Sequence, residues 1–297
     1  METILETFNL TKKFPGKVAV NQVNLHIQKG DIYGFIGRNG AGKTTTMKLI
    51  LGLLNITEGE VELFGSKNLI EGRRKIGSLI EAPGFYKNAS AYENMKRYAI
   101  FTNSTDEEIK ELLELVGLGN VGKKKAGQFS LGMKQRLGMA MALLGNPELL
   151  ILDEPINGLD PAGIKEIRDT ILKLNKEKGV TFLISSHLLD ELAKITTRYG
   201  IINDGILVEE VDAKVLMERC KANLKIVVDN PEKALKVLTK TKLLDNYRID
   251  GNQIMLYEDK IQPAEVNKIL VEAGIAVSEI TMNQNAFEEY FIERIGK

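Results

Sequence analysis

The feature that most constrains the fold of this chain is a glycine-rich run, Gly37-Arg38-Asn39-Gly40-Ala41-Gly42-Lys43-Thr44-Thr45. The run fits the pattern G-x-x-x-x-G-K-[ST], and it lies between a strand-like segment, residues 31–36, and a helix-like apolar segment, residues 46–51. A loop of this kind directs backbone N–H groups and the positive end of a helix dipole toward an anion. The order strand, loop, helix therefore predicts a phosphate-binding loop in an α/β fold.

Each residue type in this run has a chemical reason. Glycine lets the backbone approach phosphate oxygens closely because it has no Cβ. Lys43 supplies a positive charge to the phosphates, and the hydroxyl of Thr44 is a suitable Mg²⁺ ligand. The alternative interpretation is a glycine-rich turn that happens to precede a helix. The phosphate interpretation predicts that a nucleotide is bound by Gly37, Arg38, Asn39, Gly40, Ala41, Gly42, Lys43, Thr44 and Thr45.

A second polar element follows an apolar strand. Residues 149–152 are all aliphatic, and Asp153 and Glu154 come directly after them. With a phosphate loop upstream, Asp153 is expected to hold Mg²⁺, directly or through water, and Glu154 is expected to polarise the attacking water. Without that loop, the same pattern would indicate only a buried strand that ends in solvated acids.

The charge balance and the cysteine content limit the classes of protein to which this chain can belong. The 297 residues include 40 Lys+Arg and 40 Asp+Glu, and this balance argues against a general nucleic-acid binder, although it leaves open a binder with one local basic face. No apolar run in the sequence approaches the ~18 residues that span a bilayer. A single cysteine, Cys220, fits a reducing compartment. We therefore expect a cytosolic protein.

The chain is long enough for about two domains. Apolar strands interleaved with helices, such as residues 180–184, predict a largely parallel sheet that is covered on both faces. Residues beyond about 215 follow the order β-α-β-β-α-β, the split-βαβ pattern. We expect an α/β domain over residues 1–217, with a helical subdomain at about 84–145, and a small ferredoxin-like α+β domain over residues 218–297.

Three more motifs lie downstream of the phosphate loop. One run resembles the signature sequence of ABC ATPases, Phe129-Ser130-Leu131-Gly132-Met133-Lys134-Gln135-Arg136. Asn157-Gly158-Leu159-Asp160 resembles the D-loop of that family, and His187 stands where its switch histidine is expected. Together with the phosphate loop and the acid pair, these motifs cover roughly residues 1–217 in the order of the family. The chain thus resembles an ATP-binding subunit of an ABC transporter, with a P-loop NTPase core.

The resemblance implies ATP as the nucleotide and Mg²⁺ as the metal. It makes Phe14 an aromatic platform that stacks on adenine, with Val18 nearby in the same pocket. The alternative for Phe14 is a core phenylalanine on an edge strand. The resemblance also makes Lys43, Glu154 and His187 part of the catalytic machinery, with His187 contacting the γ-phosphate and orienting the attacking water.

The family works as a head-to-tail dimer, here with a second copy of the chain or with a paralogous ATPase. The resemblance implies that Ser130 and Gly132 close on the γ-phosphate held at Lys43 of the opposite subunit. It also implies that Asp160 communicates across the dimer. The signature departs from the common pattern at Leu131, which replaces a glycine, but it keeps Gly132, the residue that must approach the phosphate closely.

One departure bears on the chemistry of the site. At the position after residues 75–80, most members carry a glutamine that reaches Mg²⁺ and the attacking water, whereas this chain has Glu81. The resemblance makes Glu81 a candidate metal ligand, with Thr44 and Asp153, and a candidate catalytic residue, but its charge adds to that of the triphosphate. Residues 78–86 are similar to the bacitracin-resistance and lantibiotic-immunity subgroup, which has glutamate here. The alternative is a neutral replacement with no bearing on the substrate.

The resemblance implies an ATP-hydrolysing subunit that powers a membrane exporter and confers resistance or immunity to an antibiotic or antimicrobial peptide. Its membrane-spanning permease would be a separate chain, contacted near Phe85 and Tyr86, although this aromatic pair also fits local packing. The subunit would be cytoplasmic, peripheral on the inner face of the plasma membrane, and would bind no nucleic acid. Two alternatives stay open: a ribosome- or DNA-associated ABC protein, which the neutral charge disfavours, and an inactive subunit, which the presence of Glu154 and His187 disfavours.

Overall fold

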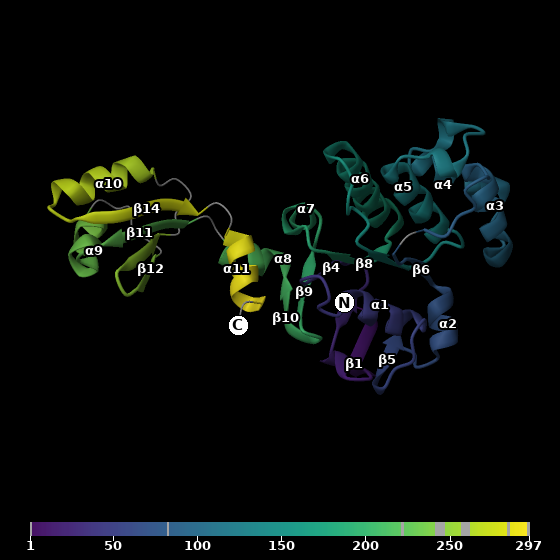
Figure 1. Ribbon diagram of the computed structural model, residues 1–297, viewed down its shortest axis with the longest axis horizontal. Helices are drawn as coiled ribbons and strands as arrows, with labels where there is room; N and C mark the ends of the chain where they lie inside the picture. Colours follow the sequence, from purple (N-terminus) through teal and green to yellow (C-terminus); the bar gives the residue numbers. More distant parts are fainter. Residues whose placement is uncertain are drawn as a thin grey trace. The chain divides into compact units, whose positions relative to one another are not determined.

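The computed structural model of the protein describes residues 2–81, 83–220, 223–240, 247–256, 262–283 and 286–295 (Figure 1). The chain divides into two compact units, Met1–Ala213 and Lys214–Lys297. The observed division, after Ala213, comes slightly earlier than the division expected after residue 217. The difference has a physical reason. Helix α8 (Ala213–Arg219) is tied to the second unit, because Arg219 donates a hydrogen bond of 3.2 Å from Nη1 to the hydroxyl of Tyr290.

The first unit is built on a six-stranded sheet whose strands, in spatial order, are β10 (Ile206–Asp212), β9 (Arg198–Asn203), β4 (Ile32–Ile36), β8 (Thr181–Ser186), β7 (Leu149–Asp153) and β6 (Ile76–Leu79) (Figure 1). The strands from β9 to β6 are parallel, whereas the edge strand β10 is antiparallel to β9. Every residue of β4, β7 and β8 is buried. The covered parallel sheet that the uniformly apolar strands predict is therefore confirmed.

A smaller antiparallel sheet carries the first strand of the chain. It consists of β2 (Lys17–Val23), β1 (Thr3–Phe14), β3 (His26–Gln28) and β5 (Glu58–Leu63), with β5 also paired to β1. Leu10 of β1 belongs to one hydrophobic cluster with Phe35 of β4 and Met47 of helix α1 (Lys43–Leu51). Burial in this shared core stabilises α1 against both sheets, and α1 is the helix at which the phosphate loop ends.

The helical segment between β6 and β7 comprises α3 (Ala91–Thr102), α4 (Asp106–Leu115), two 3₁₀ turns (Gly119–Val121 and Ala126–Gln128) and α5 (Leu131–Ala142). Capping boxes begin α3 at Ser90 with Glu93 and α4 at Thr105 with Glu108. The expected helical subdomain is present, and its α-helices lie between Ala91 and Ala142 (Figure 1). The other helices of this unit are α2 (Leu69–Arg74), α6 (Pro161–Lys178) and α7 (Leu189–Ala193). No helix in the described ranges is long and apolar enough to cross a membrane.

After helix α8, the second unit has the element order β-α-β-β-α-β, followed by a last helix, α11 (Ala286–Ile295). Its sheet has the spatial order β12 (Tyr247–Asp250), β13 (Gln253–Leu256), β11 (Asn223–Val228) and β14 (Val277–Asn283), and neighbouring strands are antiparallel. The two strands that each helix connects are thus separated by a third strand, which is the split-βαβ arrangement. The core of this unit is completed by helices α9 (Pro231–Lys240) and α10 (Pro263–Glu272).

A substitution at Gly77 of β6 tests how closely the central sheet packs against the helical subdomain. A Cβ at this position would overlap the backbone oxygen of Ala142 at the end of α5 and would lie 2.7 Å from Cδ2 of Leu150. We expect Gly77→Ala to lower the free energy of unfolding by about 1–3 kcal/mol, the usual cost of overpacking, in chemical denaturation. Gly84→Ala is the matched control, because the nearest atom to its added Cβ is Oη of Tyr98 at 3.7 Å. Equal stabilities of the two variants would contradict this close approach.

Candidate active site

Neighbouring parallel strands end at one edge of the central sheet, and each is followed by polar residues. Strand β4 leads to Gly37, β8 leads to His187, β7 ends at Asp153 and is followed by Glu154, and β6 leads to Glu81. The carboxyl ends of parallel strands form the usual ligand-binding edge of an open α/β sheet. Strand order therefore brings together residues that are far apart in the sequence.

The phosphate loop depends on glycine at specific positions. Gly40 and Gly42 have φ values of 83° and 111°, which side chains with a Cβ rarely adopt. A Cβ at Gly42 would also lie 2.7 Å from the backbone oxygen of Ala19. The Lys43 side chain is only 5% exposed, and its Nζ donates a hydrogen bond of 2.7 Å to the carbonyl of Gly37. The loop thus folds around its own lysine and presents that charge at the phosphate position.

The side chains suited to Mg²⁺ meet at the start of α1. The Thr44 hydroxyl donates a hydrogen bond of 2.8 Å to Oδ2 of Asp153, and the Ser185 hydroxyl donates one of 2.6 Å to Oδ1. Within the described residues, no group of three or more His, Cys, Asp or Glu side chains forms a protein-only metal site. Mg²⁺ in nucleotide sites usually has one or two protein oxygens and takes its other ligands from phosphates and water, so Thr44 and Asp153 fit it.

Glu154 lies between a histidine and the phosphate-loop lysine. Its Oε2 is 2.8 Å from Nδ1 of His187, and its Oε1 is 3.4 Å from Nζ of Lys43. The backbone of Glu154 is left-handed, with φ 49°, and its N–H donates to the hydroxyl of Ser185 at 2.9 Å. Oε1 is buried and accepts no hydrogen bond within the described part of the chain. This carboxylate is therefore held between His187 and Lys43, and its Oε1 keeps the capacity to accept a hydrogen bond.

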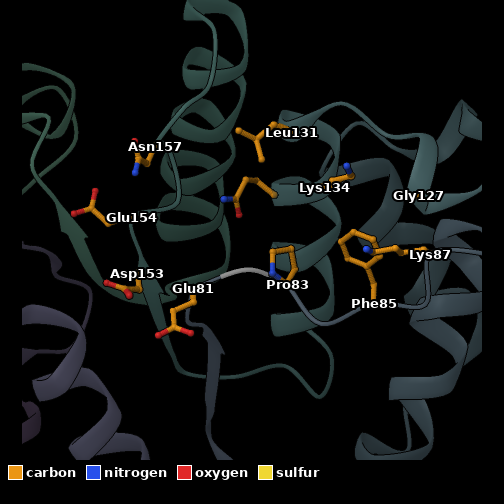
Figure 2. Close-up of a pocket in the computed structure, with 11 residues that line it drawn as sticks. Glu81, Pro83, Phe85, Lys87, Gly127, Leu131, Lys134, Asp153, Glu154 and Asn157 are labelled. Atoms are coloured by element: carbon orange, nitrogen blue, oxygen red, sulfur yellow. The ribbon is translucent and has the colours of Figure 1, made fainter.

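Two cavities meet at Glu154. The larger, of about 620 Å³, has Glu81 and Asp153 on one side and Phe85 and Lys87 on the other (Figure 2). Its remaining lining residues are Pro83, Gly127, Leu131, Lys134, Gln135, Glu154 and Asn157. The smaller, of about 360 Å³, is lined by Phe14, Lys17, Ala19, Arg38, Asn39, Gly40, Gly42, Lys43, Thr44, Thr45 and Glu154. The smaller cavity follows the phosphate loop and is the candidate nucleotide site.

Phe14 opens onto the candidate nucleotide site. Its side chain is 42% exposed at the end of the β1–β2 hairpin, and Nζ of Lys12 lies 5.1 Å from the ring centroid. The alternative that Phe14 is a core residue is therefore wrong. Val18 is also exposed, at 44%, but it is not among the described lining residues of this cavity. The role of both residues in adenine binding stays a prediction.

The signature residues surround the start of helix α5, and Leu131, Lys134 and Gln135 line the larger cavity. Ser130 is the N-cap of α5, and its hydroxyl accepts a hydrogen bond of 3.3 Å from the N–H of Met133. Gly132 is open, since the nearest atom to an added Cβ would be Cδ2 of Leu159 at 3.7 Å. Neither Ser130 nor Gly132 is among the described residues that line the phosphate-loop cavity. Asp160, the D-loop acid, caps α6 by accepting from the N–H of Gly163 at 3.1 Å.

Sequence reasoning missed two functional candidates. Ser185 connects Asp153 to the backbone of Glu154, and its place directly at the end of an apolar strand was a usable signal. Lys48 forms an ion pair of 2.6 Å with Glu81, which has a left-handed φ of 61°. No local sequence signal indicates that pair, because the two residues come from separate elements.

Known proteins are similar to this chain in sequence and in fold. A family model described as ABC transporter matches residues 20–157. The bacitracin transport ATP-binding protein BcrA of Bacillus licheniformis is 45% identical, over 100% of this chain and 98% of that relative. The lantibiotic transport ATP-binding protein SrtF of Streptococcus pyogenes is 46% identical, over 72% of this chain and 94% of that relative. A solved dimeric ATP-binding cassette in a post-hydrolysis state with ADP and Pi has a TM-score of 0.64 at 26% identity, covering 71% of this chain and 99% of its own.

Ser185→Ala tests whether the serine positions both acids. The change removes the hydrogen bonds to Asp153 and Glu154, so we expect magnesium-dependent nucleotide hydrolysis to fall by about 10- to 100-fold, as for other residues that orient metal ligands. Nucleotide binding should change less. Ser186→Ala is the matched control, because this equally buried hydroxyl accepts from the N–H of Leu188 instead. Equal activity in the two variants would show that Ser185 does not position the two acids.

Phe14→Ala tests the aromatic platform. Stacking of a base on an aromatic ring contributes about 1–3 kcal/mol, so nucleotide affinity should fall by roughly 5- to 150-fold in a fluorescence titration. Phe8→Ala is the control, because Phe8 lies on the same strand and is 40% exposed but is not among the residues described at the cavity. If both variants bind as tightly as the wild type, adenine binds elsewhere.

Proposed function

The chain belongs to the ABC transporter family as an ATP-binding, ATP-hydrolysing subunit, and from that premise we propose that it powers the export of a peptide antibiotic. The observation that carries the catalytic part is Glu154, placed between His187 and Lys43 beside the Thr44–Asp153 pair. The substrate class is supported by the names of two relatives, which transport bacitracin and a lantibiotic. Glu81, in the place of the usual glutamine, agrees with that subgroup.

The proposed mechanism assigns one task to each side chain. The loop N–H groups and Lys43 bind the phosphates, and Thr44 and Asp153 hold Mg²⁺, which supplies charge neutralisation at the phosphate oxygens. Glu154 would accept a hydrogen bond from the attacking water through Oε1, which accepts none from the described part of the chain. His187 is oriented by its hydrogen bond to Glu154 and contacts the γ-phosphate.

The proposed assembly needs two further chains. A second copy or a paralogous ATPase, arranged head to tail, would place its Ser130 and Gly132 over the nucleotide bound at Lys43. A separate membrane permease would dock near Phe85 and Tyr86, so the subunit would lie at the cytoplasmic face of the plasma membrane. Tyr86 is 59% exposed.

The loop that carries Phe85 and Tyr86 is held in place by residues of the helical subdomain. Asn94 is fully buried; its Oδ1 accepts from the N–H of Tyr86 at 2.7 Å, and its Nδ2 donates to the carbonyl of Tyr86 at 3.1 Å. The guanidinium of Arg97 lies 4.8 Å from the Tyr86 ring centroid. A fixed and exposed aromatic side chain binds a partner with little loss of conformational entropy, which supports a docking role over local packing.

Glu154→Gln separates nucleotide binding from hydrolysis. The amide cannot accept a proton from water, so hydrolysis should fall by about 100-fold or more while ATP binding is retained. Bound ATP should then hold the purified chain as a dimer in size-exclusion chromatography. A wild-type rate of ATP hydrolysis in this variant would contradict the catalytic role of Glu154.

The same variant tests the transport function in cells. Deletion of the gene in the source organism should increase sensitivity to bacitracin or to a lantibiotic, and the wild-type gene, but not the Glu154→Gln variant, should restore resistance. The tagged variant should also be recovered from membranes together with a permease, identified by mass spectrometry. Unchanged sensitivity would contradict the proposed substrate class, and recovery with ribosomes would contradict the transport function.

A further inference from the structure

An ion pair links the phosphate-loop helix to Glu81. Lys48 lies in the last turn of α1, the helix that begins at Lys43, and its Nζ donates a hydrogen bond of 2.6 Å to Oε1 of Glu81. The Lys48 side chain is 28% exposed, whereas that of Glu81 is 65% exposed. A single helix therefore presents one lysine to the phosphate loop and another to this carboxylate.

The backbone at Glu81 has an uncommon conformation. Its φ of 61° lies in the left-handed region, which is unfavourable for a residue with a Cβ. Such a conformation persists where the surroundings determine it, and it is typical of functional sites. Glu81 comes shortly after β6, and β6 pairs in parallel with β7, the strand that ends at Asp153. The fold therefore places Glu81 just after the carboxyl end of β6, at the same end of the sheet as Asp153.

Negative charge accumulates in the cavity at this edge. The carboxylates of Glu81, Asp153 and Glu154 all line it. Asp153 is bonded by two neutral hydroxyls, and Glu154 shares Lys43 with the phosphate loop. A bound triphosphate would draw on Lys43 and add further negative charge in the adjoining nucleotide cavity, which meets this one at Glu154. Lys48 is the cation that the structure pairs with Glu81.

We propose that Lys48 is a positioning residue for Glu81, which offsets the charge that this glutamate brings to the triphosphate site. A glutamine at the same place is neutral and needs no counter-ion. Glu81 has two alternative cationic partners, the ammonium of Lys48 and Mg²⁺, since Mg²⁺ prefers carboxylate and other oxygen ligands. The inference rests on the ATP site of the proposed function and is independent of the transported substrate.

Loss of Lys48 has an effect that depends on Mg²⁺. In K48M, Glu81 keeps its charge without a counter-ion, so it repels a metal-free triphosphate but is free to help bind the magnesium complex. We expect the Kd of a fluorescent ATP analogue in EDTA to rise by about two- to fivefold, the size typical of a partly exposed ion pair. In excess Mg²⁺, the Kd should rise less or fall. The ratio of the Kd in EDTA to the Kd in excess Mg²⁺, measured by titration of the full chain, should therefore be larger in K48M than in the wild type.

Three further variants make the test specific. K48R keeps the charge and should leave the ratio at the wild-type value. E81Q removes the glutamate charge, so in the double variant E81Q/K48M it should suppress the effect of K48M relative to E81Q alone, because coupled residues give non-additive changes. K67M removes a lysine from an exposed ion pair with Glu60, and it should leave the ratio unchanged.

The proposal is overturned by an unchanged Kd ratio in K48M, or by a K48M effect of the same size in the E81Q background. An equal loss of affinity with and without Mg²⁺ also overturns it, because a merely structural defect would act in this way. If K48M lowers the thermal unfolding midpoint, K48Q gives the same comparison with a polar side chain. A chain that shows the expected ratios but confers no resistance would contradict the proposed substrate and leave this inference intact.

Discussion

The buried carboxylate of Asp153 is the constraint on which the rest of the site depends. A buried charged group is stable only when its oxygens are bonded, and here each oxygen accepts a hydrogen bond from a different element. Thr44 donates from the start of α1 and Ser185 donates from the end of β8. The helix and the two strands are thereby held together at their polar ends. Lys43 follows as the neighbour of Thr44, and Glu154 as the neighbour of Asp153, with 3.4 Å between Nζ and Oε1.

Backbone conformation then determines where the other acids lie. Glu154 and Glu81 each follow a parallel strand of the central sheet, and their φ values are 49° and 61°. A left-handed residue turns the chain sharply, so neither residue continues its strand. The conformational cost, of order 1–3 kcal/mol for each, is offset by the packing of the buried strands that precede them. The rigid sheet thus maintains an arrangement of acids that an isolated loop would not adopt.

The sequence predicted best what depends on neighbours in the chain. The aliphatic run before Asp153 and the glycine-rich run before Lys43 are local signals, and both the buried strand and the helix are present in the structure. Contacts that depend on strand order were not predictable in this way. Ser185 reaches Asp153 only because β8 lies beside β7, and Lys48 reaches Glu81 only because α1 packs near the end of β6. Local patterns identify the parts of the site, whereas the topology determines which parts interact.

The position of the signature helix explains why two chains belong to one proposed catalytic unit. Ser130 caps its own helix through the N–H of Met133, and Gly132 leaves space in front of the helix start. Within the described chain, neither residue lines the cavity at the phosphate loop. A helix N-terminus with an open glycine is suited to an anion, such as the phosphate of a nucleotide. In the proposed head-to-tail dimer, this anion would be the nucleotide at Lys43 of the opposite subunit. Closure of the dimer would then complete each site with the partner's helix and would couple hydrolysis at Glu154 to the movement of two chains.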